Sequence, residues 1–463
     1  MLNLIKKYGD EFKNILQKTD FVNIIVHFDT DGITSAAILT KALQKEDKKF
    51  RVRIVKQLSN EVIKEIENEK IVLFLDLGSS FLKELEKVKG DVFVLDHHEL
   101  AGDIKDMKNM RDGANLPSKI RLVNPHLFDE EDISGAGLAY LFVRSLQGPS
   151  AELADLAIVG MVGDMLEQNL SKLNNLILRD TDNITIKKSL LIFSATRPLQ
   201  KALEFSSDFF IPSVTGSSYG VSQLLREANI KSIEGKGYRT LLDLNEEEVS
   251  RLITAILLRS GDKKGIIGNI YLLKFFDHLE DVRELSTLIN ACSRLGHPDI
   301  SLALCLGSSK AKTKAERIYN TYKHSLIGAL KWVSNTKKIE GKRFVIINAK
   351  DKIRDTIIGT IMSILAKSFL YAEGTIIIGM AYANDNSYNN KNNEKIKVSA
   401  RVVGKSDVNL KLLLEKACKN MGETEYGGHA KAAGCSLPKS KEQEFIENLR
   451  KELETESIKI KIR

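Results

Sequence analysis

Three short apolar segments of this 463-residue chain each end in acids or histidines, and this pattern limits the possible folds more than any other feature. Residues 22–27, 71–75 and 92–95 have the apolar character of buried β-strands. The polar residues at or just after their ends are His27, Asp29, Asp31, Asp76, Asp96, His97 and His98. Ligand sites of open parallel sheets lie beyond the carboxyl ends of the strands, so we expect these side chains to share one crevice. So many carboxylates and imidazoles close together are stable only with bound cations.

The composition is that of a globular protein with two or three domains. The chain is too long for one ordinary core, and 43% hydrophobic with 28% charged residues is typical of soluble proteins. No apolar run is long enough to cross a bilayer. The first 20 residues mix charged and apolar residues at helical spacing, which is unlike a signal peptide. We therefore expect a cytoplasmic protein with no membrane partner.

The four cysteines and the net charge narrow the class further. The cysteines form no Cys-x-x-Cys pair, so we expect reduced, mostly buried thiols and neither a zinc site nor disulfides. A net charge of +8 favours polyanionic partners, although a lysine-rich solvated surface explains it equally well. Residues 310–338 hold no proline, one glycine and eight basic residues, which predicts a long basic helix.

The order of the expected elements predicts an α/β protein with four regions. Strands alternate with helices over residues 1–190, which predicts a parallel-sheet domain. Residues 191–309 are mostly helical, residues 310–338 form a connecting helix, and residues 339–463 form a smaller α/β domain. Expected strands are 22–27, 52–55, 71–75, 92–95, 344–347, 375–379 and 395–403, and expected helices follow Gly32 and span about 60–69, 79–88, 136–147 and 151–166. The Asn-rich composition of residues 384–394 predicts a hairpin loop.

The first motif alternates His27, Asp29 and Asp31, so an extended backbone points all three side chains the same way. Gly32 permits a sharp exit into a helix, whose N-terminus adds free N–H groups beside the acids. A simple turn with a helix cap explains the motif about equally well.

Three further elements repeat the pattern. An acid after one buried strand, such as Asp76, is usually a cap, but Asp76 and Asp96 on two strands of one sheet favour a site. His97 and His98 follow a buried strand, and imidazole is a common metal ligand, although polar surface is the alternative. Asp164 completes an apolar helical stripe, where a carboxylate needs a partner: a metal, or else a cap or an arginine.

In chain order these motifs resemble those of the DHH phosphoesterases. The four matching motifs are His27-x-Asp29-x-Asp31-Gly32, Asp76, Asp96-His97-His98 and Gly163-Asp164, and residues 427–434, Gly-Gly-His-Ala-Lys-Ala-Ala-Gly, resemble the signature of the DHH-associated substrate-binding domain. Residues 134–137 and 290–296 resemble segments of the archaeal RecJ-like nucleases, including the GINS-associated nuclease. Little sequence follows the last motif, so we expect no OB-fold domain of the bacterial RecJ type.

The resemblance implies two Mn²⁺ or Mg²⁺ ions. One would be held by His27, Asp29 and Asp76. The other would be held by Asp31, Asp76, His97 and Asp164, with Asp76 bridging. Asp96 would orient a ligand imidazole, and His98 would contact the scissile phosphate.

A second group of residues is expected to hold the substrate. Gly427 and Gly428 allow the backbone to approach a phosphate, the alanines after His429 are expected to begin a helix whose N–H groups face it, and His429 adds a donor. Ser399 and Arg401 share one face of a strand, where Arg401 would be a phosphate fork. The alternatives are an ordinary turn for the glycines and a surface role for Arg401.

The resemblance implies a two-metal exonuclease that acts on single-stranded DNA or RNA in replication or repair. It also implies GINS and the replicative helicase as partners of the helical region. One alternative is hydrolysis of short oligonucleotides, cyclic dinucleotides or pyrophosphate. The other is a replisome scaffold without essential catalysis. The polarity of digestion and the choice between DNA and RNA are left open by these residues.

Overall fold

The computed structural model describes the whole chain except residues 101–116, 129–131, 193, 207–210, 236, 261–265, 368–369, 384–394, 405, 420, 422–423 and 463. The chain forms two compact units. The first comprises residues 1–202, 228–254 and 263–319, and the second comprises residues 203–227, 255–262 and 320–463. The expected hairpin loop at 384–394 lies outside the described residues.

The first unit contains a five-stranded sheet in which all strands run parallel. Its strands are β1 (Phe21–His27), β2 (Lys49–Val55), β3 (Ile71–Leu75), β4 (Asp91–Leu95) and β5 (Ile120–Val123), in the order β2-β1-β3-β4-β5. The four predicted strands are therefore confirmed, and β5 is a fifth that the sequence pattern did not reveal. The chain leaves β1 towards β2 at one edge and then returns to β3 on the other side, so β1 and β3 flank the topological switch point.

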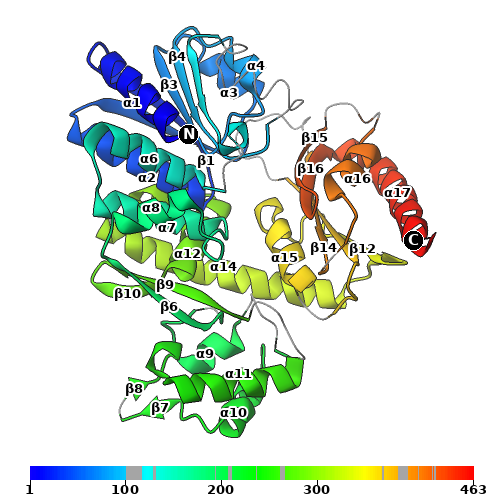
Figure 1. Cartoon of the computed structure of the whole chain (residues 1–463). Coiled ribbons are helices and arrows are strands. Elements are labelled where there is room, and N and C mark those ends of the chain that lie inside the picture. Colours follow the sequence, from blue (N-terminus) through cyan, green and yellow to red (C-terminus); the bar gives the residue numbers. More distant parts are fainter. Residues whose placement is uncertain are drawn as a thin grey trace. The chain divides into compact units, whose positions relative to one another are not determined.

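Helices cover both faces of this sheet, as a parallel sheet requires (Figure 1). One face packs against α1 (Leu2–Leu16), α2 (Thr30–Lys45), α6 (Gly135–Gln147) and α7 (Ala151–Gly163). The other face packs against α3 (Asn60–Glu65) and the short α4 (Leu82–Leu85). Successive residues of β3 alternate between these two cores, with Leu73 facing the first and Phe74 the second. This alternation explains why the strands are apolar throughout.

A second, antiparallel sheet in the first unit departs from the expected helical pattern. Strands β6 (Ile184–Leu190), β9 (Ile267–Phe275) and β10 (His278–Asp281) pair in the order β10-β9-β6. The prediction that residues 191–309 are mostly helical is thus right for most elements but wrong for β9, for β10 and for a short two-stranded ribbon at residues 233–238. Helix α8 (Lys172–Arg179) precedes this sheet, and α12 (Val282–Arg294) and α13 (Pro298–Cys305) follow it. Helix α12 packs against α7, which bears directly on the site described below.

Between β6 and β9 the described residues form mainly helices. These are α9 (Leu199–Glu204), α10 (Ser218–Glu227) and α11 (Glu246–Ser260), with the short ribbon β7 (Ile233–Glu234) and β8 (Gly237–Tyr238) between α10 and α11. Arg239 fixes the start of α11, because its guanidinium pairs with Glu248 at 2.6 Å.

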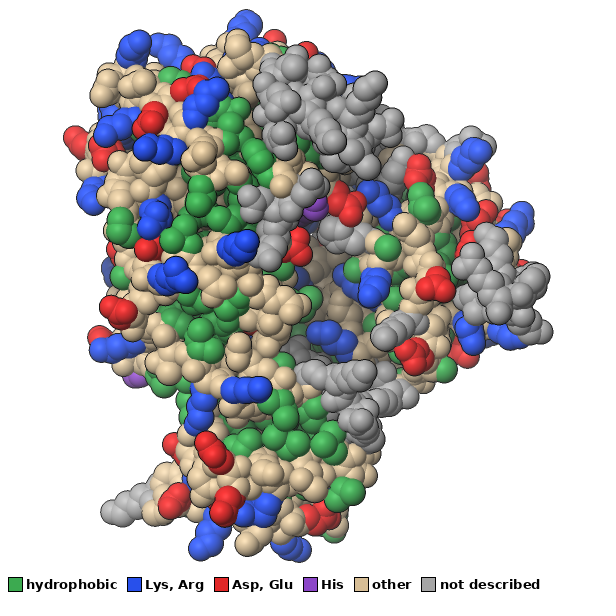
Figure 2. Space-filling view, in the orientation of Figure 1, with side chains coloured by type: hydrophobic (Ala, Val, Ile, Leu, Met, Phe, Trp, Pro, Cys, Tyr) green, Lys and Arg blue, Asp and Glu red, His purple; other side chains and the backbone are tan. Residues whose placement is uncertain are grey.

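The predicted basic helix is confirmed as α14 (Ser309–Asn335), which is 27 residues long. On the face of the molecule shown in Figure 2, Lys and Arg side chains are interspersed with Asp and Glu and do not gather in one patch.

The second unit holds a six-stranded sheet in the order β11-β12-β13-β14-β16-β15. Its strands are β11 (Ile339–Gly341), β12 (Phe344–Asn348), β13 (Ile376–Tyr382), β14 (Lys395–Val402), β15 (Glu425–His429) and β16 (Ala432–Pro438). Only β12 and β13 pair in parallel. Helices α16 (Leu410–Ala417) and α17 (Glu442–Ile462) pack on one face, and α15 (Asp355–Lys367) contacts β13 and β14.

The helix expected after His429 is absent, because Ala432 to Pro438 form strand β16. Ala433, Cys435 and Leu437 alternate into the core while their neighbours are more exposed, which is the period of a strand. The prediction of a helical N-terminus at this motif is therefore wrong.

All four cysteines are buried and free, as expected. No helix in the described part of the chain is both long and apolar enough to span a bilayer.

Candidate metal centre

The loop after β1 places three polar side chains at the switch point. His27 is the last residue of β1, and Asp29 is the N-cap of α2, where its Oδ1 accepts a hydrogen bond from Gly32 N at 3.0 Å. The turn is tight: a Cβ on Gly32 would lie 2.2 Å from the carbonyl oxygen of His27. A glycine is therefore required there. Nδ1 of His27 lies 2.9 Å from Oδ2 of Asp29, so these two side chains meet as expected. The expected extended backbone does not reach Asp31, which lies in the first turn of α2 (Thr30–Lys45).

Asp31 is fully buried and is held by the N-terminus of α6. Its two carboxylate oxygens accept hydrogen bonds from Gly135 N at 2.5 Å and Ala136 N at 2.9 Å. The positive end of the α6 dipole thus faces the acid. A Cβ on Gly160 of α7 would lie 2.5 Å from Oδ1 of Asp31, so the absence of a side chain there makes room for the carboxylate.

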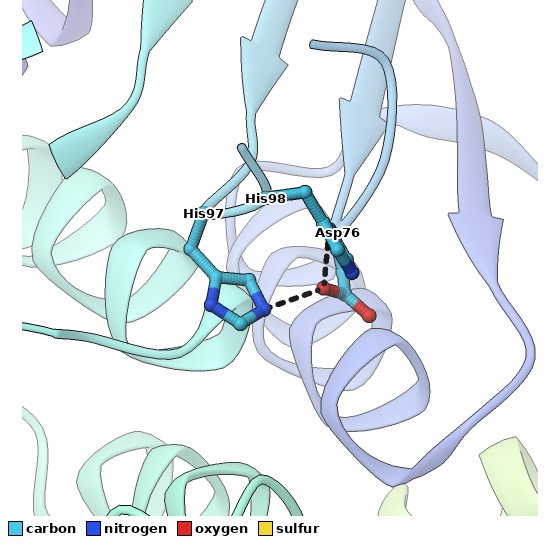
Figure 3. Close-up of side chains that lie close together, drawn as sticks. All are labelled: Asp76, His97 and His98. Carbon is cyan, nitrogen blue, oxygen red and sulfur yellow. Dashed lines mark ion pairs between the residues drawn. The ribbon is translucent and has the colours of Figure 1, made fainter. Parts of the chain in front are cut away.

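Asp76 occupies the centre of the cluster. It follows β3 with a left-handed backbone (φ 58°), a conformation that costs energy in a residue other than glycine and is found at functional sites. Its Oδ2 lies 3.3 Å from His27 Nδ1, and its Oδ1 lies 3.2 Å from His97 Nε2. Figure 3 shows the ion-pair contacts of Asp76 with His97 and, at 3.8 Å, with His98. Both oxygens of Asp76 are buried and make no hydrogen bond to the described part of the chain.

Asp164 joins the cluster from α7. It is the C-cap of that helix, because α7 ends at Gly163 and not at about residue 166 as expected. Its Oδ2 lies 3.1 Å from His97 Nε2, and Oδ2 of Asp31 lies 3.7 Å from the same nitrogen. Like charges on Asp31 and Asp164 are therefore brought close around one imidazole.

The cluster places several acidic side chains close together in a buried site, and the pKa values of its residues reflect this excess of negative charge. Burial raises the pKa of Asp31 well above its usual value, and the charges of Asp164 and Asp76 raise it further. Burial by itself would lower the pKa of His97, but the close approach and negative charges of Asp164 and Asp76 outweigh it and hold the pKa well above its ordinary value. The pKa of His27 is raised in the same way by Asp29 and Asp76 against the effect of burial. Bound cations would offset this crowding of negative charge in a buried site.

The donor set fits divalent cations. The described residues hold three groups of potential ligand atoms: His27, Asp29 and Asp76; Asp76, His97 and His98; and Asp31, His97 and Asp164. Asp76 belongs to two of these groups and lies 3.2 Å from His97, which belongs to the third. The buried atoms without a hydrogen-bond partner include His27 Nδ1 and both oxygens of Asp76. Carboxylate oxygens with a few imidazole nitrogens suit Mn²⁺ or Mg²⁺.

Asp96 and His98 form a separate pair at the edge of the cluster. Oδ1 of Asp96 lies 2.7 Å from His98 Nδ1, and Oδ2 accepts a hydrogen bond from Ser79 N at 2.8 Å. Asp96 thus orients His98, whereas the expectation was that it orients a ligand imidazole. About half of the His98 side chain is exposed, so its ring can reach a substrate.

Helix α12 supports the first loop, which the sequence pattern did not reveal. Thr30 N donates to Oδ1 of Asn290 at 3.0 Å, and the Thr30 hydroxyl donates to the carbonyl of Ser286 at 2.7 Å. Asn290 lies in a segment that was matched only by family resemblance. Its contact joins positions 260 residues apart, so no local pattern reveals it.

The expected substrate-binding residues lie in the second unit. Arg401 and Ser399 share the β14 face that α15 covers: Arg401 Nε donates to Ser363 Oγ at 2.9 Å, and its terminal nitrogen lies 3.2 Å from Ser399 Oγ. Gly427 and Gly428 are exposed on the edge strand β15. The side chain of His429 lies outside the described residues.

Three sequence families match this chain. The DHH family N-terminal domain matches residues 21–161, the DHH-CID domain matches residues 192–267, and the DHHA1 domain matches residues 341–455.

Two related sequences are informative. The protein MJ0831 of Methanocaldococcus jannaschii is 28% identical over 465 residues and is matched over 94% of both chains. The single-stranded-DNA-specific exonuclease RecJ of Bacillus subtilis is 23% identical over 178 residues, which is 35% of this chain but only 21% of that protein.

Two solved structures share the fold. RecJ from Thermus thermophilus in complex with Mn²⁺ has a TM-score of 0.58 and 18% identity, covering 96% of this chain and 54% of RecJ. CDC45 from Entamoeba histolytica has a TM-score of 0.64 and 11% identity, covering 96% of this chain and 99% of CDC45. At these identities the likeness concerns the fold alone.

Proposed function

This chain is a RecJ-like member of the DHH superfamily, whose members are phosphoesterases, and from this premise we propose that it is a metal-dependent exonuclease of single-stranded nucleic acid. The substrate would be DNA, RNA or both, and the biological setting would be replication or repair. Two Mn²⁺ or Mg²⁺ ions would occupy the centre described above.

One observation carries the proposal: the Asp76 carboxylate is buried, has no hydrogen-bond partner in the described residues, and belongs to two of the three groups of potential ligands. His27 lies on its Oδ2 side, and His97 lies on its Oδ1 side. A carboxylate in this position is suited to bridge two cations. Two divalent cations held by these residues would supply an activated water and would stabilise the leaving oxygen of a displacement at phosphorus.

The chain's own residues would then divide the remaining work. Asp31 and Asp164 would hold the second ion with His97, and the α6 N–H groups fix the orientation of Asp31. His98, with its Nδ1 held by Asp96, would direct its other nitrogen at the scissile phosphate. Burial raises the pKa of Asp96, but the hydrogen bond and charge of His98 and the Ser79 N–H outweigh burial and leave that pKa below its ordinary value. Asp96 therefore stays ionised and favours a protonated His98.

The second unit would hold the nucleic acid backbone. Arg401 presents a guanidinium beside the Ser399 hydroxyl, which is suited to a phosphate. The exposed backbone at Gly427 and Gly428 on the edge strand would allow a phosphate to approach closely, and His429 would add a donor.

The fold similarity to CDC45 gives a specific reason to keep a second function, that of a replisome scaffold. GINS and the replicative helicase would be the partners, and residues 192–267 would be the docking region. A pure scaffold has no need of the buried acids, whose mutual repulsion costs stability. Catalysis therefore explains more of the site than scaffolding does, and the two can coexist.

The test is digestion of end-labelled single-stranded DNA and RNA with Mn²⁺, beside an Asp76→Ala variant. We expect mononucleotide release by the wild-type protein and none by the variant. Equal activity in the variant contradicts the bridging carboxylate. Faster turnover of a dinucleotide than of a long strand would favour the short-oligonucleotide alternative, and no hydrolysis of either would favour the scaffold.

A further inference from the structure

A fully buried asparagine just beyond β5 lies behind the His97–His98 loop. Asn124 has no exposed surface, and its side-chain amide nitrogen bonds groups next to the candidate metal centre. Its Nδ2 donates to the carbonyl oxygen of His98 at 2.9 Å and to Ser79 Oγ at 2.9 Å. Its Oδ1 accepts from His126 N at 2.9 Å. Both ends of the amide are therefore in use.

These hydrogen bonds belong to a closed ring that joins residues following three strands. Ser79, which follows β3, donates its N–H to Asp96, which follows β4, at 2.8 Å. Asp96 accepts from the backbone N–H of His98 at 3.2 Å and lies 2.7 Å from its Nδ1. Asn124, which follows β5, then bonds both His98 and Ser79. Asn124, Ser79, Asp96 and His98 are thus linked in a ring.

His126 adds a second attachment to the same loop. Its Nε2 lies 3.1 Å from the carbonyl oxygen of His97. Its backbone N–H donates the hydrogen bond that Oδ1 of Asn124 accepts. Pro125 between them begins a short 3-10 helix, which fixes the spacing of the two residues. The carbonyls of both His97 and His98 are therefore fixed from the end of β5.

We propose that Asn124 and His126 are positioning residues that aim His97 at the metal-bridging carboxylate and His98 at the substrate. Among the described hydrogen bonds, neither side chain contacts the side chain of Asp76 or of another proposed ligand, and both reach the loop through the backbone carbonyls of His97 and His98. Among the described hydrogen bonds, none involves the other ring nitrogen of His97, Nδ1. The approach of the ring to Asp76 and Asp164 therefore depends on the backbone that carries it.

The inference rests on the proposed function only for its kinetic readout, so the main test is binding of Mn²⁺, followed through the signal of free Mn²⁺ in electron paramagnetic resonance. His126 is exposed, so His126→Ala leaves folding intact. We expect His126→Ala and Asn124→Ala to weaken Mn²⁺ binding by about 10- to 100-fold, as loss of a supporting residue does. His126→Gln, whose amide nitrogen can replace Nε2, restores binding.

A matched control separates positioning from stability. Asn23 is also a buried asparagine of this sheet, but it lies four residues before His27, about 13 Å from the carboxyl edge. Asn23→Ala should lower the melting temperature as Asn124→Ala does and leave Mn²⁺ affinity unchanged. On the nuclease substrate, the Asn124 and His126 variants should lower kcat and leave KM within about 2-fold.

The outcomes are distinguishable from those of the proposed function. The wild-type protein could lack nuclease activity while the Asn124 and His126 variants bind Mn²⁺ more weakly than it does. That result supports the inference and refutes the proposed exonuclease. Wild-type Mn²⁺ affinity and kcat in folded His126→Ala and Asn124→Ala proteins overturn the inference and leave the exonuclease standing. Equal losses in Asn23→Ala also overturn it, because a general loss of stability then explains them.

Discussion

Nε2 of His97 lies 3.2 Å from Oδ1 of Asp76, although the two residues follow different strands. Strands β3 and β4 pair in register, with Leu75 opposite Leu95, so Asp76 and His97 begin from the same edge of the sheet. The contact joins an acid that has no hydrogen-bond partner in the described residues to a histidine that also approaches Asp164. It is the structural basis for the first two predictions.

Asp76→Asn should stabilise the metal-free protein and abolish its response to metal. Asparagine tolerates the left-handed backbone of this position, and the change removes one of several crowded negative charges. We expect a gain of about 0.5–2 kcal/mol without metal, no thermal stabilisation by Mn²⁺, and a loss of activity greater than the roughly 100-fold typical of a supporting residue. Thermal melts with and without Mn²⁺ measure this. Asp20→Asn, at an exposed site, is the control, and a Mn²⁺ response retained by Asp76→Asn would contradict the bridging role.

His97→Ala and His98→Ala should have different effects on Mn²⁺ binding and on activity. His97 approaches three acids of the cluster, so its loss should weaken Mn²⁺ binding together with activity. His98 is held by Asp96 and is half exposed, so its loss should lower kcat by about 10²–10⁴-fold and leave most of the Mn²⁺ affinity. Calorimetric titration with Mn²⁺ beside single-turnover kinetics separates the two. Identical behaviour of the two variants would argue against separate roles.

The adjacent glycines Gly427 and Gly428 offer a matched pair. A Cβ on Gly428 would lie 2.4 Å from the Ala432 carbonyl, and its φ is +110°, so Gly428→Ala should destabilise the hairpin by about 1–3 kcal/mol. A Cβ on Gly427 meets no described atom within 4 Å, so Gly427→Ala should fold normally. If the backbone here binds a phosphate, Gly427→Ala should still raise KM for a long strand. Unchanged KM in this well-folded variant would remove the glycine pair from the substrate site.

Arg401→Ala should raise KM for long single strands more than it lowers kcat. Removing one phosphate contact should also reduce the salt dependence of binding, by about 0.7 in the slope of log K against log salt. Arg450→Ala is a suitable control, because Arg450 is an exposed arginine on α17 in the same unit. Filter binding at several salt concentrations measures the slope. A slope equal to that of the Arg450 variant would show that Arg401 makes contacts within the protein, such as those to Ser363 and Ser399, and no phosphate contact.

The sequence predicts the first sheet and the positions of its acids well, because apolar strands and the polar residues at their ends are local patterns. His27, Asp29, Asp31, Asp76, His97 and Asp164 do lie together. That they hold metal remains a prediction, as do the domain boundaries at residues 190, 309 and 338.

The errors have physical causes. The alanines after His429 favour a helix in isolation, yet strand pairing with β14 and β15 makes this segment β16. Strand β5 is four residues long and too short to show a period. Asn124 and Asn290 were missed because each acts on a loop far away in sequence, and no spacing rule connects such positions.

The close fit of Gly160 against Asp31 affects how relatives of this protein are classified as active or inactive from their sequences. One added methyl group on α7 would displace a carboxylate that is itself unchanged, so a natural variant with alanine there could keep every acid and histidine of the motifs and yet be inert. A comparison of active and inactive homologues therefore needs to include the residue at position 160 as well as the proposed ligands.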